Sequence, residues 1–464
     1  MPRFGLKARQ RRALISLGLA SLLTACAGVE PLPPSQAAIP GSESLASSPL
    51  VTPRWPQLFQ APSLQPLIRE ALAHNQDFKA ARSRLEAAFA NTEGDSRWPT
   101  INAEVNRQRR DNDGIKTDSA SAALSVNWEL DVWGRLAAEN AVAAYTAQSL
   151  AADTQWAQYS LAANVAKAWL TAVANHAQWQ LSQQRQASLE QSTDIIENGY
   201  ENGTRDALEV YSARAELANS AAAELQAQRA FENSRYQLNV LLGRFPGQAI
   251  ELPESLPAPD NELPAELSSS LLERRPDVRA AQLTLAAQEA QWAVAKRNRW
   301  PRFALTAQAG NASDRLSSVA SGNDPFWTAI GNLSMPLFQG KALAAEQQRQ
   351  AHLYEAELAN YRSTALTAFQ EALNAIDNTT SLHRRWQLAQ SASDSARQAE
   401  EQALESYLSG ISNFNTWLQA QRSAFDSASA TITAQSAWLQ NRIDLHLALG
   451  GDFDLTQEET HDAP

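Results

Sequence analysis

Two carboxylates, Glu129 and Asp131, are the clearest candidates for chemistry, because they lie two residues apart and share one face of an alternating segment. Two carboxylates close together could serve a glycoside hydrolase. The charged wall of a water-filled channel explains them equally well. The sequence contains no nucleophile motif, phosphate-binding loop or zinc signature. We therefore expect no enzyme, and neither a cofactor nor a metal site.

The single cysteine, Cys26, is the other reactive side chain, and one cysteine excludes a disulfide framework. It follows five basic residues and an apolar segment, the layout of a secretory signal. Residues 23–26, Leu-Thr-Ala-Cys, resemble a bacterial lipobox, which implies cleavage before Cys26 and lipid attachment to it. A plain signal peptide with a chance cysteine is the alternative. Ala27 stands where an aspartate would suggest inner-membrane retention, so we expect a lipid-anchored outer-membrane protein that extends into the periplasm.

Long segments without glycine or proline dominate the rest of the chain. The stretch 135–198 would form a helix about 96 Å long. It is rich in alanine, the best helix former. Its larger apolar residues form a narrow stripe of coiled-coil type that must pack against other long helices. Corresponding intervals at 67–93, 204–242, 277–300, 341–409 and 411–449 predict five further helices. We expect each pair of short helices to stack end to end beside a long one.

The sequence contains an internal repeat. Arg97-Trp98-Pro99 recurs as Arg299-Trp300-Pro301, and several other pairs recur at an offset of 207 residues. A nearly constant offset indicates internal duplication. The predicted organisation is a signal peptide (1–25), a lipid-anchored Pro/Ser-rich tether (26–62), a first repeat (63–243), a linker (244–270), a second repeat (271–450) and an acidic C-terminal tail (451–464).

Alternating polar and apolar residues between the short and long helices predict two strands in each repeat, of roughly the length that a tilted membrane strand needs. A half-buried sheet of a soluble protein is the alternative. Four strands cannot close a barrel, and lipid does not allow open strand edges, so an oligomer would have to supply the rest. Four tryptophans lie where an aromatic membrane girdle would need them: Trp98, Trp128, Trp300 and Trp327.

The formal net charge of −11 disfavours nucleic acid as a partner. Beyond the leader, no apolar run is long enough for a membrane-spanning helix, so any crossing of a bilayer would need strands.

With these parts in order, the sequence resembles the TolC/OprM family of outer-membrane channels, in the lipoprotein branch that serves efflux pumps. The motifs that carry the resemblance are Arg274-Arg275-Pro276-Asp277-Val278, Arg299-Trp300-Pro301, Leu337-Phe338-Gln339-Gly340, Gly203 and Gly410. The resemblance implies a mainly α fold with a membrane β-barrel, in which a homotrimer forms twelve strands and twelve helical rods. It also implies a periplasmic adaptor protein and an inner-membrane pump of the RND type as partners, with outer-membrane lipid around the barrel.

The turns between long and short helices lie farthest from the strands and should form the periplasmic mouth. The resemblance implies that this mouth closes through hydrogen bonds and ion pairs and meets the adaptor. By position we assign closure or adaptor contact to Tyr200, Gly203, Arg205, Asp206, Glu209, Tyr407 and Gly410. An ordinary helix turn explains the glycines and Asp206 as well. Thr416 and Gln419 stand where relatives commonly carry carboxylates, which argues against an acidic ring.

The function that follows is an outer-membrane channel that releases drugs or other small toxic compounds from the periplasm. A duct for type I protein secretion shares the architecture and remains the alternative. A coiled-coil scaffold is less favoured, because it has no use for lipid-facing strands.

Overall fold

The computed structural model describes residues 61–112, 115–257, 275–319 and 324–450. Cys26, the signal peptide, the segment 451–464, most of the tether and residues 258–270 of the linker lie outside these ranges. The chain divides into two compact units, one around 90–146 and 286–356 and the other around 48–89, 147–285 and 357–464. Each unit takes segments from both halves of the chain, so the compact units do not coincide with the sequence repeats.

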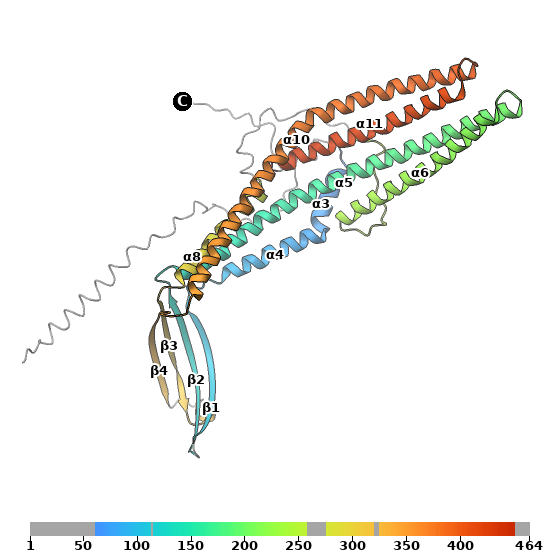
Figure 1. The fold of residues 1–464 in the computed structure, drawn as a ribbon. Helices are drawn as coiled ribbons and strands as arrows, with labels where there is room; N and C mark the ends of the chain where they lie inside the picture. The colour runs from blue at the N-terminus through green and yellow to red at the C-terminus, as the bar shows by residue number, and fades with distance from the viewer. Residues whose placement is uncertain (1–60, 113–114, 258–274, 320–323, 451–464) are drawn as a thin grey trace, which may run out of the picture. The chain divides into compact units, whose positions relative to one another are not determined.

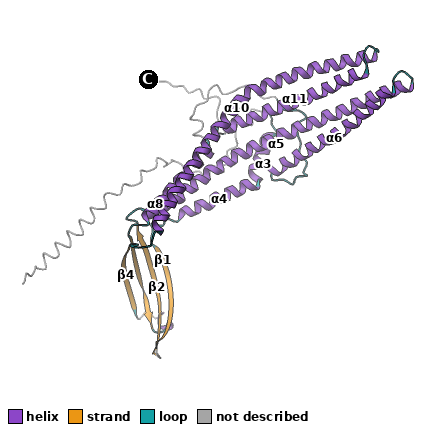
Figure 2. Cartoon of the chain, in the orientation of Figure 1, coloured by secondary structure: helices purple, strands orange, loops and turns teal. Residues whose placement is uncertain are grey.

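The first unit contains one antiparallel sheet in the order β1-β2-β3-β4, drawn in orange in Figure 2. Its strands are β1 (Thr100–Asn112), β2 (Ile115–Leu130), β3 (Arg302–Ser313) and β4 (Pro325–Ser334). The short helix α9 (Leu316–Val319) lies between β3 and β4. The central ladder, from Ala120↔Ser313 to Leu130↔Phe303, joins the two halves of the chain. Within each half the two strands also pair antiparallel, β1 with β2 and β3 with β4, which confirms one strand hairpin in each half.

One face of this sheet is apolar and exposed in the single chain. Ile101, Val126, Ala307 and Ala329 are in register across the four strands. Large side chains on this face are between 43% and 70% exposed: Ile101, Val105, Leu124, Leu305 and Leu333. Since β1 and β4 each have a partner on one side only, both edges of the sheet present unpaired backbone groups within the described chain.

The two longest described helices have 67 residues each, and most of each belongs to the second unit: α5 (Arg135–Glu201) and α10 (Ala342–Leu408). Each is followed by a helix of 35 residues, α6 (Ala207–Leu241) or α11 (Phe414–Ala448), which runs back beside it (Figure 1). By helix rise, 67 residues span about 100 Å. In the described part of the chain, no helix has the length and apolar composition needed to cross a bilayer.

The predicted helix at 67–93 is interrupted at Asn75, which has extended backbone angles and separates α3 (Leu64–His74) from α4 (Gln76–Glu93). Its side chain accepts a hydrogen bond from the Phe78 backbone N–H, 3.0 Å away, and so begins α4. It also donates to the Leu241 carbonyl oxygen at 3.0 Å. The prediction of one unbroken helix was wrong because an asparagine can end one helix and begin the next without glycine or proline.

The end-to-end stacking of the short helices is confirmed. In the first repeat, Arg244, just beyond α6, pairs with Glu70 of α3 at 2.5 Å. In the second, α8 (Pro276–Arg297) begins beside the end of α11, where Arg275 donates to the Ala448 carbonyl oxygen at 3.3 Å. Arg275 is only 1% exposed and pairs with Asp277 and Glu371.

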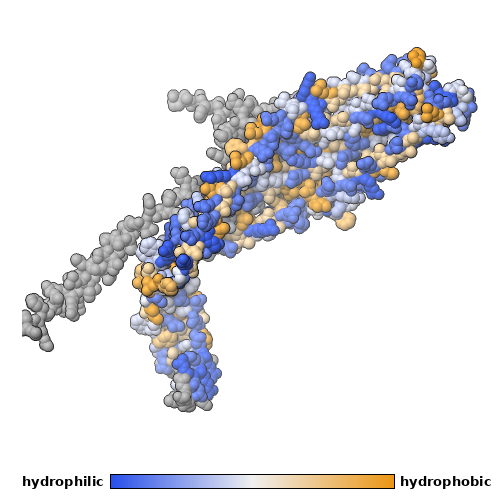
Figure 3. All heavy atoms as spheres, viewed as in Figure 1, coloured by the Kyte–Doolittle hydropathy of each residue, from blue (hydrophilic) through white to orange (hydrophobic). Residues whose placement is uncertain are grey.

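The main hydrophobic core of the second unit combines α3, the middle of α5, the end of α6 and α11, with Trp169, Leu170, Leu238, Leu439 and Ile443 among its buried members. Over the whole of α5, alanine is the most frequent buried residue. Figure 3 shows hydrophobic residues scattered among hydrophilic ones over the visible face of the helices. The long helices therefore present much of their apolar surface outward in the single chain.

Candidate functional site

The two turns that join the long helices to the short ones are built alike. Gly203 and Gly410 both have φ of 71°, the left-handed conformation that favours glycine. The Gly203 N–H donates to the Tyr200 carbonyl oxygen at 2.9 Å, and the Gly410 N–H donates to that of Tyr407 at 3.0 Å. The two turns are thus the same structural element in both repeats.

The helices after the turns begin with matching caps. Asp206 accepts a hydrogen bond from the Glu209 backbone N–H at 2.9 Å, and Asn413 accepts one from the Thr416 N–H at 3.0 Å. The Asp206 side chain therefore caps α6. Thr416 and Gln419 are exposed.

Tyr407 is the centre of the candidate site. It lies at the end of α10 and is 0% exposed. Its hydroxyl donates to Glu209 Oε2 of α6 at 3.3 Å, and the Arg205 guanidinium carbon lies 4.0 Å from the centre of its ring. A guanidinium at this distance is attracted by the ring face. Three of the predicted residues, from both repeats, are thus in contact at one place.

Burial raises the pKa of the Tyr407 hydroxyl to about 12, and the carboxylate of Glu209 acts in the same direction, while Arg205 opposes it. The hydroxyl therefore stays protonated across the physiological pH range and remains a donor to Glu209.

Gly199, in the last turn of α5, makes room for Arg205. A Cβ added at Gly199 would lie 2.5 Å from Arg205 Cγ. Because this approach is too close for any side chain, glycine at this position allows Arg205 to lie across the Tyr407 ring.

Tyr407 packs against an aromatic cluster that was not predicted from the sequence. The Trp417 ring stacks on Tyr407 at 5.1 Å, and Phe414 packs edge-on against Trp417 at 6.0 Å. Val210 and Ile196 from the other repeat join the same hydrophobic cluster. The spacing of Phe414 and Trp417, one turn apart in the first turns of α11, was the available signal.

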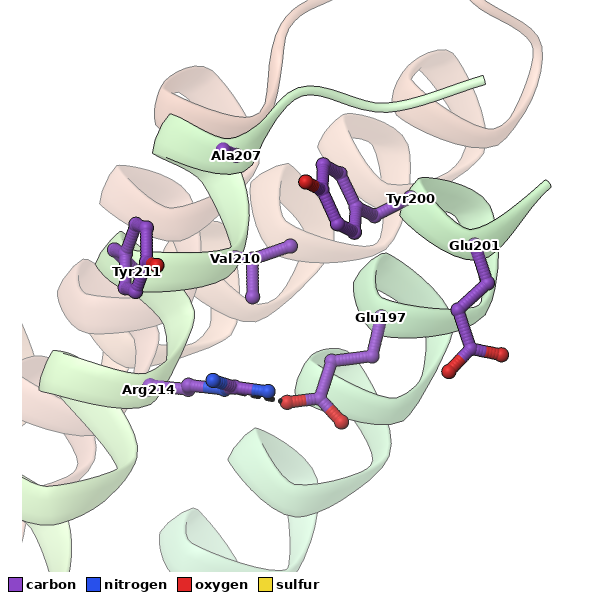
Figure 4. A pocket seen from close by; sticks show the side chains of 7 residues that line it. All are labelled: Glu197, Tyr200, Glu201, Ala207, Val210, Tyr211 and Arg214. Atoms are coloured by element: carbon purple, nitrogen blue, oxygen red, sulfur yellow. Dashed lines mark hydrogen bonds and ion pairs between the residues drawn. The ribbon is translucent and has the colours of Figure 1, made fainter. Parts of the chain in front are cut away.

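Tyr200 does not join this cluster. It is 50% exposed and lines a cavity of about 220 Å³ between α5 and α6, opposite Tyr211 and Val210. Figure 4 shows the cavity, with Glu197 paired to Arg214 beside it. Tyr200 therefore lies outside the hydrophobic cluster that encloses Tyr407.

A buried carboxylate further along the helices also escaped the sequence analysis. Glu216 of α6 is 5% exposed and pairs with Arg185 of α5 at 2.9 Å and with Arg422 of α11 at 2.5 Å. The hydrogen bond from Arg422 lowers the pKa of Glu216, burial opposes this, and Arg185 adds to the lowering. Nothing in the pattern of α6 marks Glu216 as buried, because its partners come from distant segments.

Glu129 and Asp131, the two neighbouring carboxylates of the β2 segment, both have structural partners. Asp131 accepts hydrogen bonds from the backbone N–H groups of Leu136 and Ala137 and so caps the start of α5. Glu129 pairs with Arg135 at 2.8 Å. Neither arrangement leaves the pair poised for catalysis.

The four predicted girdle tryptophans are all exposed in the single chain, at 40% to 79%. Trp128 donates from Nε1 to the Arg97 carbonyl oxygen at 2.8 Å, and Trp300 immediately precedes β3, so these two and Trp98 lie at one end of the sheet. Trp327 pairs with Ala309 and lies in the row of Leu124, about 13 Å from the row of Trp128. The four side chains therefore do not form one ring.

Comparison with known proteins agrees with this architecture. The family model described as outer membrane efflux protein matches residues 67–244 and 267–451. The antibiotic efflux pump outer membrane protein ArpC of Pseudomonas putida is 30% identical over 86% of this chain and 85% of its own. The pyoverdine export outer membrane protein OpmQ of Pseudomonas aeruginosa is 28% identical over 86% and 87%. The solved structure of the outer-membrane channel OprN superposes with a TM-score of 0.81 at 27% identity, over 86% of this chain and 92% of that one.

Proposed function

We propose that this chain, because it belongs to the outer membrane efflux protein family, works as a homotrimeric outlet for small molecules. Membership makes it an outer-membrane channel component of efflux pumps rather than an enzyme. The finer features of the proposal are the trimer, the lipid anchor, the partners, the cargo and the roles of the turn residues.

The proposal of a trimer is supported by the four-stranded sheet, which has two unpaired edges and an exposed apolar face. Three copies would supply twelve strands, whose edges pair with one another and whose apolar faces meet lipid. The tryptophans at one end of the sheet would then lie near one membrane surface, while Trp327, about 13 Å further along the strands, would face lipid.

Native mass spectrometry of the detergent-solubilised protein tests the trimer. We expect a single species with three times the mass of the mature chain. A stable monomer that keeps its strand and helix content would overturn the proposed assembly.

For the cargo we propose small organic compounds, since ArpC is named for antibiotic efflux and OpmQ for pyoverdine export. An adaptor protein and an inner-membrane pump of the RND type would deliver them. Protein secretion finds no support in the names of these relatives. Expression in a strain that lacks its own efflux channel should restore antibiotic resistance when a matching adaptor and pump are supplied, and restored secretion of a protein without restored resistance would favour the alternative.

The lipid anchor rests on the Leu-Thr-Ala-Cys motif at 23–26. Mass spectrometry of the mature protein should find an acylated amino-terminal cysteine at Cys26. An amino terminus elsewhere would exclude it.

For the turns we propose that Arg205, Glu209 and Tyr407 hold the periplasmic mouth closed in the resting channel. Gly203 and Gly410 shape the turns, Asp206 caps α6, and Tyr200 with its cavity faces the adaptor. Support comes from the direct contacts of the first three residues and from the exposure of Tyr200.

A further inference from the structure

An aromatic cluster links α5 to α6 well away from the turns. His176 and Trp179 of α5 stack against Phe231 of α6, with ring centres 4.8 and 5.7 Å apart. The guanidinium carbon of Arg235 lies 5.9 Å from the centre of the same ring. We call these four residues the first-repeat cluster.

The second repeat contains the same cluster. His383 and Trp386 of α10 stack against Trp438 of α11 at 4.7 and 4.9 Å, and Arg442 lies 5.9 Å from the Trp438 ring. Each of these four residues follows its first-repeat counterpart by the same offset of 207 residues. Duplication has therefore preserved an imidazole, two aromatic rings and a guanidinium in one arrangement.

The two clusters differ in what covers them. Trp438 is 2% exposed and belongs to the main core together with Leu256, from the segment 244–257 that follows α6. Gln435, one turn before Trp438, donates from Nε2 to the Pro257 carbonyl oxygen at 3.3 Å. The segment that leaves the first repeat thus packs over the cluster of the second.

No described segment covers the first-repeat cluster in this way. Leu225 is 60% exposed, whereas its counterpart Ile432 packs against the core. Tyr236, next to Arg235, is 37% exposed. Among the described residues, no carboxylate forms an ion pair with Arg235, so this partly apolar surface also carries an unpaired positive charge.

The same offset identifies a segment that fits this surface. Residues 451–464 follow α11 as residues 244–257 follow α6. Each segment comes directly after a glycine with positive φ, Gly450 at 93° and Gly243 at 75°. The segment contains Phe453 and Leu455 for apolar contact. It also contains five carboxylates and no Lys or Arg: Asp452, Asp454, Glu458, Glu459 and Asp462. It therefore complements the charge of Arg235.

The order of the repeats determines which protomer's first-repeat cluster residues 451–464 can reach. Segment 244–257 leaves its own repeat and covers the next one, and in a closed ring of three chains the repeat after the second is the first repeat of the neighbouring chain. We infer that residues 451–464 of one protomer bind the first-repeat cluster of the adjacent protomer and link the trimer. This inference rests on the proposed trimer. Fourteen residues suffice, because segment 244–257 is equally long and reaches Gln435.

Photo-crosslinking in the full-length, detergent-solubilised protein tests the contact. With benzoylphenylalanine in place of Leu225, we expect crosslinked dimers in which mass mapping joins position 225 to residues 451–464. The same probe at the counterpart, Ile432, should crosslink within one chain to residues 250–257. This matched control shows that the method detects a segment covering a cluster.

Arg235→Glu should lower the crosslink yield at position 225 by about threefold, the scale of an exposed ion pair, while Arg397→Glu on α10 should leave it unchanged. Native mass spectrometry of the same samples separates failure of the proposed trimer from failure of the contact between residues 451–464 and the adjacent protomer. A monomeric species would contradict the proposed trimer. A trimer whose position 225 crosslinks only within its own chain, or to residues outside 451–464, would overturn the inference.

Discussion

Arg205 of the first repeat lies across the ring of Tyr407 of the second, with its guanidinium carbon 4.0 Å from the ring centre. The contact joins the turn after α5 to the end of α10, and Glu209 adds a hydrogen bond to the same tyrosine. A cation–π contact of this kind contributes only about 0.5 to 2 kcal/mol. Three symmetry-related copies would add up, and this makes the contact suitable for holding a mouth that must also open.

Arg205→Ser combined with Tyr407→Phe should raise the resting conductance of the reconstituted channel above that of either single variant. The double change removes both the cation and the hydroxyl while the ring keeps its stacking on Trp417. Single-channel recording in planar bilayers is the measurement, with Arg397→Ser as a control on an exposed arginine of α10. Wild-type conductance in a folded double mutant would place the closing contacts elsewhere.

Gly199→Ala should produce the same opening by a different route. The added methyl would lie 2.5 Å from Arg205 Cγ and displace Arg205 from the Tyr407 ring. We expect increased resting conductance with little loss of helix content. Gly94→Ala is the matched control, because a Cβ there has no heavy atom within 4 Å. Equal conductance in the two variants would refute the positioning role of Gly199.

Glu216→Ala should destabilise the helical part of the molecule by about 2 kcal/mol, less than the 3–5 kcal/mol of a fully buried pair because Arg185 and Arg422 are partly exposed. The loss of helical circular dichroism on heating measures this change. Glu201→Ala, at an exposed carboxylate near the turn, should have almost no effect. Indistinguishable melting curves for the two variants would contradict the role assigned to Glu216.

Acid should weaken the same part of the molecule. Because its pKa is lowered on folding, Glu216 contributes stability that is present above its unfolded pKa, near 4.5, and is lost as the pH falls through the folded pKa. The melting temperature of the wild type should therefore fall more steeply below pH 4.5 than that of Glu216→Gln. Parallel pH profiles would show that Glu216 does not carry this dependence.

Arg275→Ala should be among the most damaging single changes in the helices. It leaves Asp277 and Glu371 without their cation and removes the hydrogen bond that joins α8 to the end of α11. We expect a loss of about 3 kcal/mol or more in denaturant unfolding. Arg279→Ala, one turn along α8, should stay within about 0.5 kcal/mol, and a similar loss in both would mean that the burial of Arg275 is unimportant.

The sequence alone determined the elements and their order. Uninterrupted alanine-rich stretches such as 135–198 can form only long helices, and the period-two alternation of 120–132 can form only a strand, because both patterns are local. The repeat offset and the positive φ of Gly203 and Gly410 were readable for the same reason. The tertiary structure decided which of these elements meet. Glu216 and the two clusters that contain His176 and His383 took their partners from segments tens to hundreds of residues away. Asn75 likewise donates to the distant Leu241 carbonyl oxygen. Burial and pairing are properties of the packed chain, so no local pattern could show that Tyr407 would be enclosed while Tyr200 remained exposed.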